Sequence, residues 1–163
     1  GMSVAAEVAQ VAQSAIDDFN AAYGLCLDDD RLEQWPTLFV DDCLYQVIAR
    51  ENVDNGLPAA VMYCDSKGML ADRVVALRKA NVFPEHFNRH LIGRAVITGV
   101  EGDQVSAEAS YVVFQTRNDG ETRIYNAGKY VDRFDLSGGT VRLKSRTCIY
   151  DTLRIATLLA TPI

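Results

Sequence analysis

QVSAEASYVVFQTR, residues 104–117, is the stretch that decides the fold. Its side chains alternate between apolar and polar, which is typical of a β-strand with one buried face. The apolar positions are Val105, Ala107, Ala109, Tyr111 and Val113. At about 3.3 Å per residue the stretch extends about 46 Å, well beyond a typical strand. A strand of this length must twist and coil, so the sequence predicts a curved sheet that wraps around helices as a cone with an open mouth.

Three neighbouring segments carry the same strand signal, namely residues 90–100, 121–135 and 140–151. Short turns join them, and each turn contains glycine beside Asp or Ser, which is typical of hairpins. Connections this short join antiparallel neighbours. Gly128, inside the segment 121–135, predicts a bulge or bend that assists the curvature.

The first half of the sequence has a helical period instead. Residues 3–27 predict a long amphipathic helix. Its expected buried stripe, at steps of three and four, is Val4, Val8, Val11, Ala15, Phe19, Ala22 and Cys26. Asp28-Asp29-Asp30 predicts a solvated turn that caps a second helix, which ends at Asp41-Asp42. The buried side of that second helix is expected to carry Leu32, Trp35, Leu38 and Phe39.

A strand over residues 43–49 and a turn-rich stretch over 50–64 follow. Asp65-Ser66 then predicts the cap of a third helix over residues 67–80. Its inward side chains are expected to be Met69, Leu70, Val74 and Leu77. Helices therefore precede a mainly antiparallel meander, and the fold class is α+β with N-terminal helices packed in the curved sheet.

Length and charge limit the function. A chain of 163 residues with 48% hydrophobic residues predicts one globular domain over 1–163. Residues 1–3 are expected to be flexible, with Gly1 a tag remnant. The net charge of −6 argues against nucleic acid or an anionic membrane as a partner. The sequence shows neither a membrane-spanning run nor a signal peptide, which predicts a cytoplasmic protein.

The cysteines predict thiols and no metal site. None of the four is spaced as Cys-x-x-Cys, so neither zinc nor an iron–sulfur cluster has its usual pair of ligands. We expect free and mostly buried thiols, because the chain is long enough to fold without disulfides. The four are Cys26, Cys43, Cys64 and Cys148.

His86 and His90 raise the question of an iron site. With Glu85 or Asp72 they have the composition of a two-histidine, one-carboxylate centre. The stretch 83–88 reads as a loop, which removes the helical spacing that would bring the two rings together. We therefore expect ordinary polar contacts for both histidines.

The other titratable residues form no strong catalytic group. Asp132 and Asp135, beside Arg133, read as a solvated sheet edge. The alternation of Arg142, Lys144 and Arg146 predicts three cations on one sheet face, either solvated or facing an acidic partner. Ser106 and Ser110 have no histidine nearby in sequence, and Asp41-Asp42 reads as a turn. Three tyrosines are candidates for the mouth of the cone, as core or rim aromatics: Tyr23, Tyr45 and Tyr63.

Short motifs distributed over residues 19–155 resemble the small (β) subunit of aromatic-ring-hydroxylating dioxygenases. Their order and spacing carry the resemblance together. The motifs are Leu27-Asp28, Trp35-x-x-Leu38, Asp42-x-x-Tyr45, Leu70-x-x-Arg73-Val74-x-x-Leu77, Arg89-His90-Leu91-Ile92, Tyr111-x-x-Phe114-x-x-Arg117, Gly128-x-Tyr130-x-Asp132, Leu143-x-x-Arg146 and Asp151. Gly93-Arg94 stands where the family often has Ser/Thr-Asn, which leaves the aromatic substrate open.

The resemblance implies a cone of the nuclear-transport-factor/ketosteroid-isomerase type and a structural role. It implies a large α subunit that holds a Rieske cluster and a mononuclear iron, an α3β3 complex with a β trimer, and electrons from a reductase or ferredoxin. This chain would then contribute no catalytic, cofactor-binding or metal-binding residue.

The fold also occurs in enzymes, so two alternatives stay open. One is a ketosteroid-isomerase-like isomerase or dehydratase, and the other is a small-molecule-binding protein. In isomerases of that type the catalytic base follows the acidic pair by about five positions, which here falls near Val47, an apolar residue.

Apolar residues on the polar-alternate face of the long strands need another cover. These positions are Val112, Phe114, Cys148 and Tyr150. We predict that they lie in a subunit interface.

Overall fold

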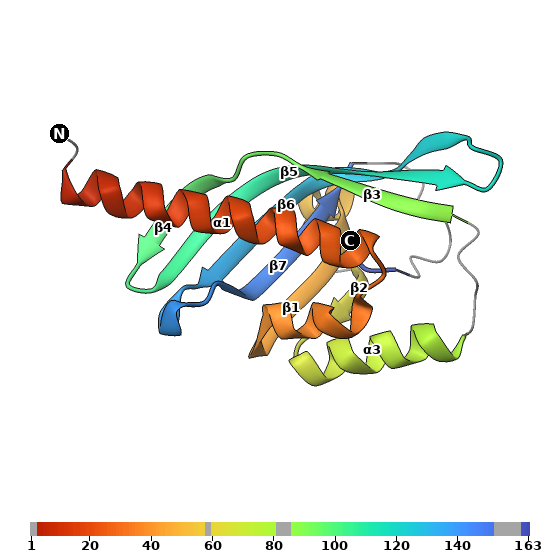
Figure 1. Ribbon diagram of the computed structural model, residues 1–163, viewed down its shortest axis with the longest axis horizontal. Coiled ribbons are helices and arrows are strands. Elements are labelled where there is room, and N and C mark those ends of the chain that lie inside the picture. Colours follow the sequence, from red (N-terminus) through yellow and green to blue (C-terminus); the bar gives the residue numbers. More distant parts are fainter. Residues whose placement is uncertain (1–2, 58–59, 81–85, 152–160) are drawn as a thin grey trace.

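The computed structural model describes residues 3–57, 60–80, 86–151 and 161–163. One curved seven-stranded sheet is the main element, and α1 lies across one of its faces (Figure 1). The strand order is β2-β1-β7-β6-β5-β3, and β4 pairs with β5 beside β3. The strands are β1 (Phe39–Ala49), β2 (Ala60–Cys64), β3 (His86–Ile92), β4 (Val96–Glu101), β5 (Gln104–Arg117), β6 (Thr122–Asp135) and β7 (Arg142–Tyr150). All pairs are antiparallel except β1 with β7, which confirms the predicted fold class.

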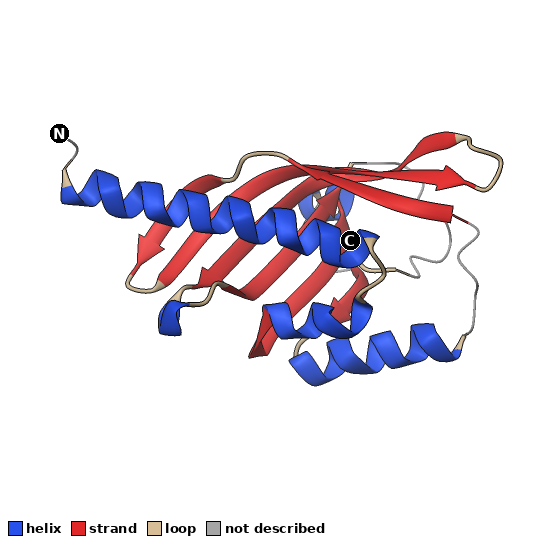
Figure 2. Cartoon of the chain, viewed as in Figure 1, coloured by secondary structure: helices blue, strands red, loops and turns tan. Residues whose placement is uncertain are grey.

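The helical elements lie before β1 or in the connections between later strands (Figure 2). They are α1 (Val4–Asp28), η1 (Leu32–Leu38), α2 (Arg50–Asp54), α3 (Lys67–Lys79) and η2 (Ser137–Gly139). The predicted cap of α3 is confirmed, because Ser66 Oγ accepts from the Met69 amide. Ser3 Oγ caps α1 in the same way by accepting from the Ala6 amide, whereas η1 has no side-chain cap. No helix among these is long and apolar enough to cross a membrane.

The strands predicted from sequence need three corrections. The second helix is a 3₁₀ helix that ends at Leu38, so Phe39 and Asp41-Asp42 belong to β1. The turn-rich stretch 50–64 contains the short helix α2 and the edge strand β2. The segment 90–100 is two strands, β3 and β4, because the chain leaves the sheet between Ile92 and Val96.

The buried stripe of α1 differs from the predicted one. Phe19 and Cys26 are buried as predicted, but Val4, Val8 and Val11 are 77%, 59% and 69% exposed. The observed stripe consists of Ala12, Ile16, Phe19, Tyr23, Cys26 and Leu27. The sheet therefore covers the apolar residues from Ala12 onward, and the valines at the N-terminal end of the helix stay exposed. On α3, Leu70 and Val74 are buried as predicted, whereas Met69 is 40% exposed.

Gly128 marks a close approach between β6 and β7. A Cβ atom at this position would overlap the Ile149 carbonyl oxygen and lie 2.7 Å from Tyr150 Cα. Both are backbone atoms, so no side chain can turn away to make room. The register shift of β6 against β5 falls nearby, where Val113 pairs with Asn126 and the next residue with Ile124. The glycine thus stands beside a bulge and not in it.

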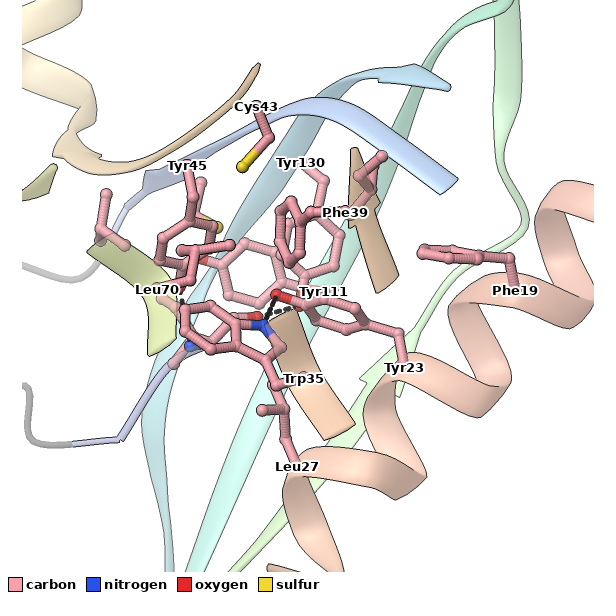
Figure 3. Packing of buried hydrophobic residues seen from close by; sticks show 14 of the residues in the cluster. Phe19, Tyr23, Leu27, Trp35, Phe39, Cys43, Tyr45, Leu70, Tyr111 and Tyr130 are labelled. Atoms are coloured by element: carbon pink, nitrogen blue, oxygen red, sulfur yellow. Dashed lines mark hydrogen bonds between the residues drawn. The ribbon is translucent and has the colours of Figure 1, made fainter. Parts of the chain in front are cut away.

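Aromatic side chains fill the space between α1, η1 and the sheet (Figure 3). Trp35 from η1 meets Phe39 and Tyr45 edge-on, with ring centroids 5.6 and 5.1 Å away. Its indole Nε1 donates to Tyr23 Oη at 3.3 Å, as the dashed line in Figure 3 shows. Such edge-to-face pairs each add about 0.5–1.5 kcal/mol beyond the area that they bury. These aromatic side chains occupy the concave side of the curved sheet.

Arg78 fastens α3 to η1 at the surface. Its guanidinium donates to both carboxylate oxygens of Glu33, at 2.7 and 2.9 Å, and to Asp30 Oδ2 at 2.7 Å. It also donates to the Asp30 carbonyl, at a residue whose φ of 59° is otherwise unfavourable for a non-glycine residue. These bonds lower the pKa of the Glu33 carboxyl to about 2.

The Glu33–Arg78 pair should make stability acid-sensitive. A depressed carboxyl pKa contributes stability above the unfolded value of about 4.3 and loses it as the pH falls towards 2. We expect Arg78→Gln to lower the urea midpoint at pH 6 and to lower it less at pH 3. Urea titrations of both proteins, followed by circular dichroism, measure the gap. An equal difference in urea midpoint between the two proteins at pH 6 and pH 3 would show that the Glu33–Arg78 pair is not the source of the acid sensitivity.

Candidate functional site

The predicted row of three cations is divided between the two faces of β7. The register of β6 against β7 shifts between Arg133 and Phe134, so one residue of β7 is extra. Lys144 stays on the outer face, where it donates to Asp42 at 2.5 Å. Arg146 is turned inward and is fully buried. The prediction that these cations share one face is therefore wrong, and the bulge is the reason.

Arg146 and Asp132 form an ion pair in the cone interior. Arg146 Nε and Nη2 donate to the two oxygens of Asp132, both at 2.9 Å. The side chains are 0% and 1% exposed. Arg146 Nη2 also donates to Asn20 Oδ1 of α1 at 2.6 Å. Asp132 is thus no solvated edge, as the sequence suggested, whereas Asp135 at the end of β6 accepts from the Ser137 amide in a turn.

Two tyrosine rings enclose the guanidinium. Its carbon lies 4.3 Å from the Tyr23 ring centroid and 3.9 Å from that of Tyr130. Burial opposes the charge, but the carboxylate of Asp132 outweighs it and raises the pKa of Arg146 above its ordinary value. Arg146 is therefore a permanent cation, held by one carboxylate and two π faces.

The rest of the interior is also occupied by tyrosines and their partners. Tyr111 stacks on Tyr130, with centroids 4.4 Å apart, and donates to Asn126 Oδ1 at 2.6 Å. Tyr130 donates to the Ile163 carbonyl at 2.5 Å, and Tyr45 Oη accepts from the Ile163 amide at 3.0 Å. Burial raises the pKa of all of these phenols. Ile163 is fully buried between these two tyrosine hydroxyls.

This interior lacks the parts of an isomerase site among the described residues. Val47, at the position that corresponds to the isomerase base, is a buried apolar residue of β1. Asp132 is committed to Arg146, so it has no free oxygen for a proton transfer. Tyr23 and Tyr45 are core residues and Tyr63 is 53% exposed on β2. The three tyrosines therefore do not form one rim.

Asp28 and His90 make a second buried polar pair, between α1 and β3. His90 Nδ1 donates to Asp28 Oδ1 and the His90 amide donates to Asp28 Oδ2, both at 2.6 Å. Each side chain is 1% exposed. Asp28 is the last residue of α1, so it is neither a solvated turn nor a cap of η1, as the sequence suggested. The resemblance motifs Leu27-Asp28 and Arg89-His90 thus meet in space.

A pocket of about 470 Å³ opens beside this pair. Its α1 wall consists of Asp17, Asn20, Ala21, Gly24, Leu25 and Asp28. Its sheet wall runs from His90 to Arg94, at the end of β3 and in the link to β4. The helix comes close to the strand at Gly24, where a Cβ atom would lie 3.2 Å from His90 Cβ. No local sequence signal points to this pocket, because its two walls lie about 70 residues apart in the chain.

The histidines and cysteines occupy separate places. His86 and His90 lie on β3, which begins at His86 and replaces the predicted loop at residues 86–88. Glu85 lies outside the described residues. In the described part of the chain, no group of three His, Cys, Asp or Glu residues is arranged to hold a metal ion. All four cysteines are free and buried, as predicted.

The four apolar residues predicted to face outward fall on both faces. Cys148 and Tyr150 are buried in the interior, with exposed fractions of 0% and 9%, so their prediction is wrong. The bulge that turned Arg146 inward turned these residues with it. Val112 and Phe114 are half-buried on the outer face, opposite Leu91 and Arg89 of β3. Whether a subunit covers them stays a prediction.

The family model described as "Ring hydroxylating beta subunit" matches residues 24–157. The chain is 46% identical to the anthranilate 1,2-dioxygenase small subunit of Burkholderia cepacia, over 84% of this chain and 85% of that one. It is 40% identical to the β2 subunit of the terephthalate 1,2-dioxygenase terminal oxygenase of a Comamonas species, over 89% and 94%.

Among solved structures, the chain is similar to the β subunit of a proposed aromatic-ring-hydroxylating dioxygenase from Novosphingobium aromaticivorans. The two are 97% identical and superpose with a TM-score of 0.90, over 96% of this chain and 99% of that one. The family-model match over residues 24–157 contains the Asp28–His90 pair, the Asp132–Arg146 pair and the close approach at Gly128.

Proposed function

This chain belongs to the family of ring-hydroxylating dioxygenase β subunits, and on that premise we propose that it supports a large α subunit without carrying iron itself. The observation that carries the proposal is the filled interior. Where an enzyme of this fold would hold substrate, this chain holds the Arg146–Asp132 pair, stacked tyrosines and Ile163. The chain of residues 1–163 then acts as one structural unit with no catalytic, cofactor-binding or metal-binding residue.

We propose that the partner is a Rieske-type α subunit. It would hold the iron–sulfur cluster and the mononuclear iron, which together supply the oxygen chemistry. The four buried thiols of this chain have neither the spacing nor the local histidines that a Rieske cluster needs. We also propose an α3β3 assembly with a β trimer, and a reductase or ferredoxin that contacts the α subunit. Free thiols are typical of the cytoplasm, where we place the complex.

We further propose that the assembled enzyme acts on an aromatic carboxylate. The two curated relatives described above are named for anthranilate and terephthalate, and both compounds are benzene rings with a carboxylate. Identities of 46% and 40% over most of the chain support the same class of substrate here. The complex would add both atoms of dioxygen to the ring next to the carboxylate.

Co-expression with a Rieske-type α subunit tests these proposals. We expect the two chains to co-purify, and oxygen uptake with NADH and reductase to require both of them. Anthranilate, terephthalate and benzoate should support turnover at least about tenfold better than toluene, which has no carboxylate.

The outcomes separate the parts of the proposal. Iron bound by this chain alone, or dioxygenase activity without an α subunit, would refute the supporting role. Turnover of toluene at the rate of benzoate would refute only the substrate class. Isomerisation of a ketosteroid by the purified chain would favour the isomerase alternative, which the filled interior argues against.

A further inference from the structure

Residues 161–163 are held inside the cone by side chains of other elements. The three residues belong to neither a helix nor a strand. The Ile163 amide donates to Tyr45 Oη of β1 at 3.0 Å, and the Ile163 carbonyl accepts from Tyr130 Oη of β6 at 2.5 Å. Two hydroxyls from different strands thus bind both polar main-chain groups of one residue. Peptide-binding sites recognise a segment by such main-chain hydrogen bonds together with a pocket for its side chain.

The side chain of Ile163 fills a pocket of this kind. Its exposed fraction is 0%, and Pro162 beside it is also buried, whereas Thr161 is half-buried. Ile163 packs within the same cluster of buried residues as Tyr45 and Tyr130. A branched apolar side chain is therefore removed from water completely, in a segment that lies outside the helices and strands.

The two hydroxyls are positioned by contacts that do not involve this segment. Tyr130 stacks on Tyr111 with ring centroids 4.4 Å apart, and the guanidinium carbon of Arg146 lies 3.9 Å from the Tyr130 centroid. Tyr45 meets Trp35 edge-on at 5.1 Å, and Figure 3 shows these rings packed close together. The site is thus preorganised, which lowers the entropic cost of binding a segment.

The chemistry of the site favours an uncharged segment. Burial raises the pKa of both phenols, so Tyr45 and Tyr130 are neutral at neutral pH. The charges of Arg146 and Asp132 are already paired through two hydrogen bonds of 2.9 Å. A charged ligand would lose its hydration and find these two charges occupied by each other. A peptide instead offers the one donor and the one acceptor that the two hydroxyls bind.

We propose that the interior of the cone is a binding site for a short, uncharged and apolar peptide segment, and that residues 161–163 are its ligand within the same chain. The two hydroxyls recognise the main chain of one residue, and the pocket recognises a branched side chain. The site goes beyond the supporting role, because it belongs to the isolated chain and needs no α subunit. Its tests use the isolated chain, so they can fail while the supporting role stands.

Hydrogen exchange in the full-length chain tests the recognition of the main chain. We expect the Ile163 amide, followed by NMR, to exchange at least about 100-fold more slowly than in an unfolded peptide, because it is buried and hydrogen-bonded. Tyr45→Phe removes the acceptor of this bond and should speed the exchange at least about tenfold. Tyr63→Phe is the matched control, because Tyr63 is 53% exposed on β2, and it should leave the exchange unchanged.

Displacement of the segment tests whether the site accepts a separate peptide. Ile163→Asp places a charge at a fully buried position, so we expect the segment to leave the cone and the Tm to fall by about 5 °C or more. N-acetyl-Thr-Pro-Ile-amide should then bind in its place, and at about 5 mM it should raise the Tm of this variant by at least about 3 °C. N-acetyl-Thr-Pro-Gly-amide lacks the side chain and should give no shift.

Thr161→Asp is the matched control for Ile163→Asp. It introduces the same charge at a half-buried residue of the same segment, so the segment should stay bound. Neither peptide should then shift the Tm of this variant or of the parent chain, because the site is already occupied.

Four results would overturn the proposal. The first two are an Ile163 amide that exchanges as fast as in an unfolded peptide, and equal exchange in Tyr45→Phe and Tyr63→Phe. The third is an equal effect of the two peptides on Ile163→Asp. The fourth is an equal shift by the isoleucine peptide in Thr161→Asp, which would place the peptide elsewhere on the chain. If Ile163→Asp does not fold, the exchange comparison remains decisive, because each of its substitutions removes a single hydroxyl.

Discussion

Gly128→Ala is expected to destabilise the protein by about 4 kcal/mol or more, or to prevent soluble expression. The methyl group would overlap the Ile149 carbonyl oxygen and approach Tyr150 Cα. To make room for the methyl group, β6 and β7 would have to separate. This would break the hydrogen-bond ladder between them, near the hydrogen bond that the Asp151 amide donates to the Ala127 carbonyl. Urea unfolding followed by circular dichroism, or the soluble yield, measures the loss.

Gly99→Ala is the matched control for this substitution. Gly99 also lies in a strand, β4, but a Cβ atom there would meet only Ser106 Cβ at an ordinary 3.9 Å. We expect a change within about 1 kcal/mol, because no backbone atom crowds the new methyl group and alanine restricts the unfolded chain. A Gly128→Ala protein as stable as the Gly99→Ala protein would refute the close approach of the two strands.

Arg146→Met is expected to cost about 3–5 kcal/mol, because it leaves the Asp132 carboxylate buried without its cation. The substitution also removes the contacts of the guanidinium with Tyr23 and Tyr130 and its bond to Asn20. The free energy of unfolding from urea titration at pH 7 measures the effect.

A double variant distinguishes a lost charge partner from lost packing. Arg146→Met combined with Asp132→Leu should recover most of the loss, since replacing both ions by apolar side chains is often neutral. The exposed pair of Lys129 with Glu108, at 2.8 Å on neighbouring strands, is the control. Lys129→Met should change stability by no more than about 1 kcal/mol. If the double variant were as unstable as Arg146→Met alone, the buried charge would not be the cause.

The sequence predicted the sheet well, because alternation and hairpin turns are local signals. Gln104–Arg117 is β5 with the predicted boundaries, and its apolar positions Val105, Tyr111 and Val113 are buried. The third helix begins at Lys67 as predicted, since a serine cap and a helical period occur together. The curvature of the sheet was predicted from the length of one strand, and that length can likewise be read from a single segment of the sequence.

The polar interior could not be predicted in the same way. One extra residue in β7 reverses the face of Arg146, Cys148 and Tyr150, and a strict period of two has no means of showing it. One local signal did favour the inward face. Arg146 lies on the same face of the strand as Cys148 and Tyr150, and these two residues are apolar. Asp28 was missed because its partner His90 is 62 residues away, and an aspartate triplet looks like a turn when read alone.

The parallel pairing of β1 with β7 has a consequence for how the chain folds during synthesis. Tyr45 lies opposite Arg146 and Ala49 lies opposite Tyr150, so the two strands meet across about 100 residues of intervening chain. Such non-local pairing raises contact order and slows folding. Among the described strands β1 pairs with β2 and β7, so on the ribosome the short β2 is its partner until β7 has emerged. The nascent chain therefore presents an unpaired strand edge while about 100 residues are synthesised, and such an edge favours aggregation.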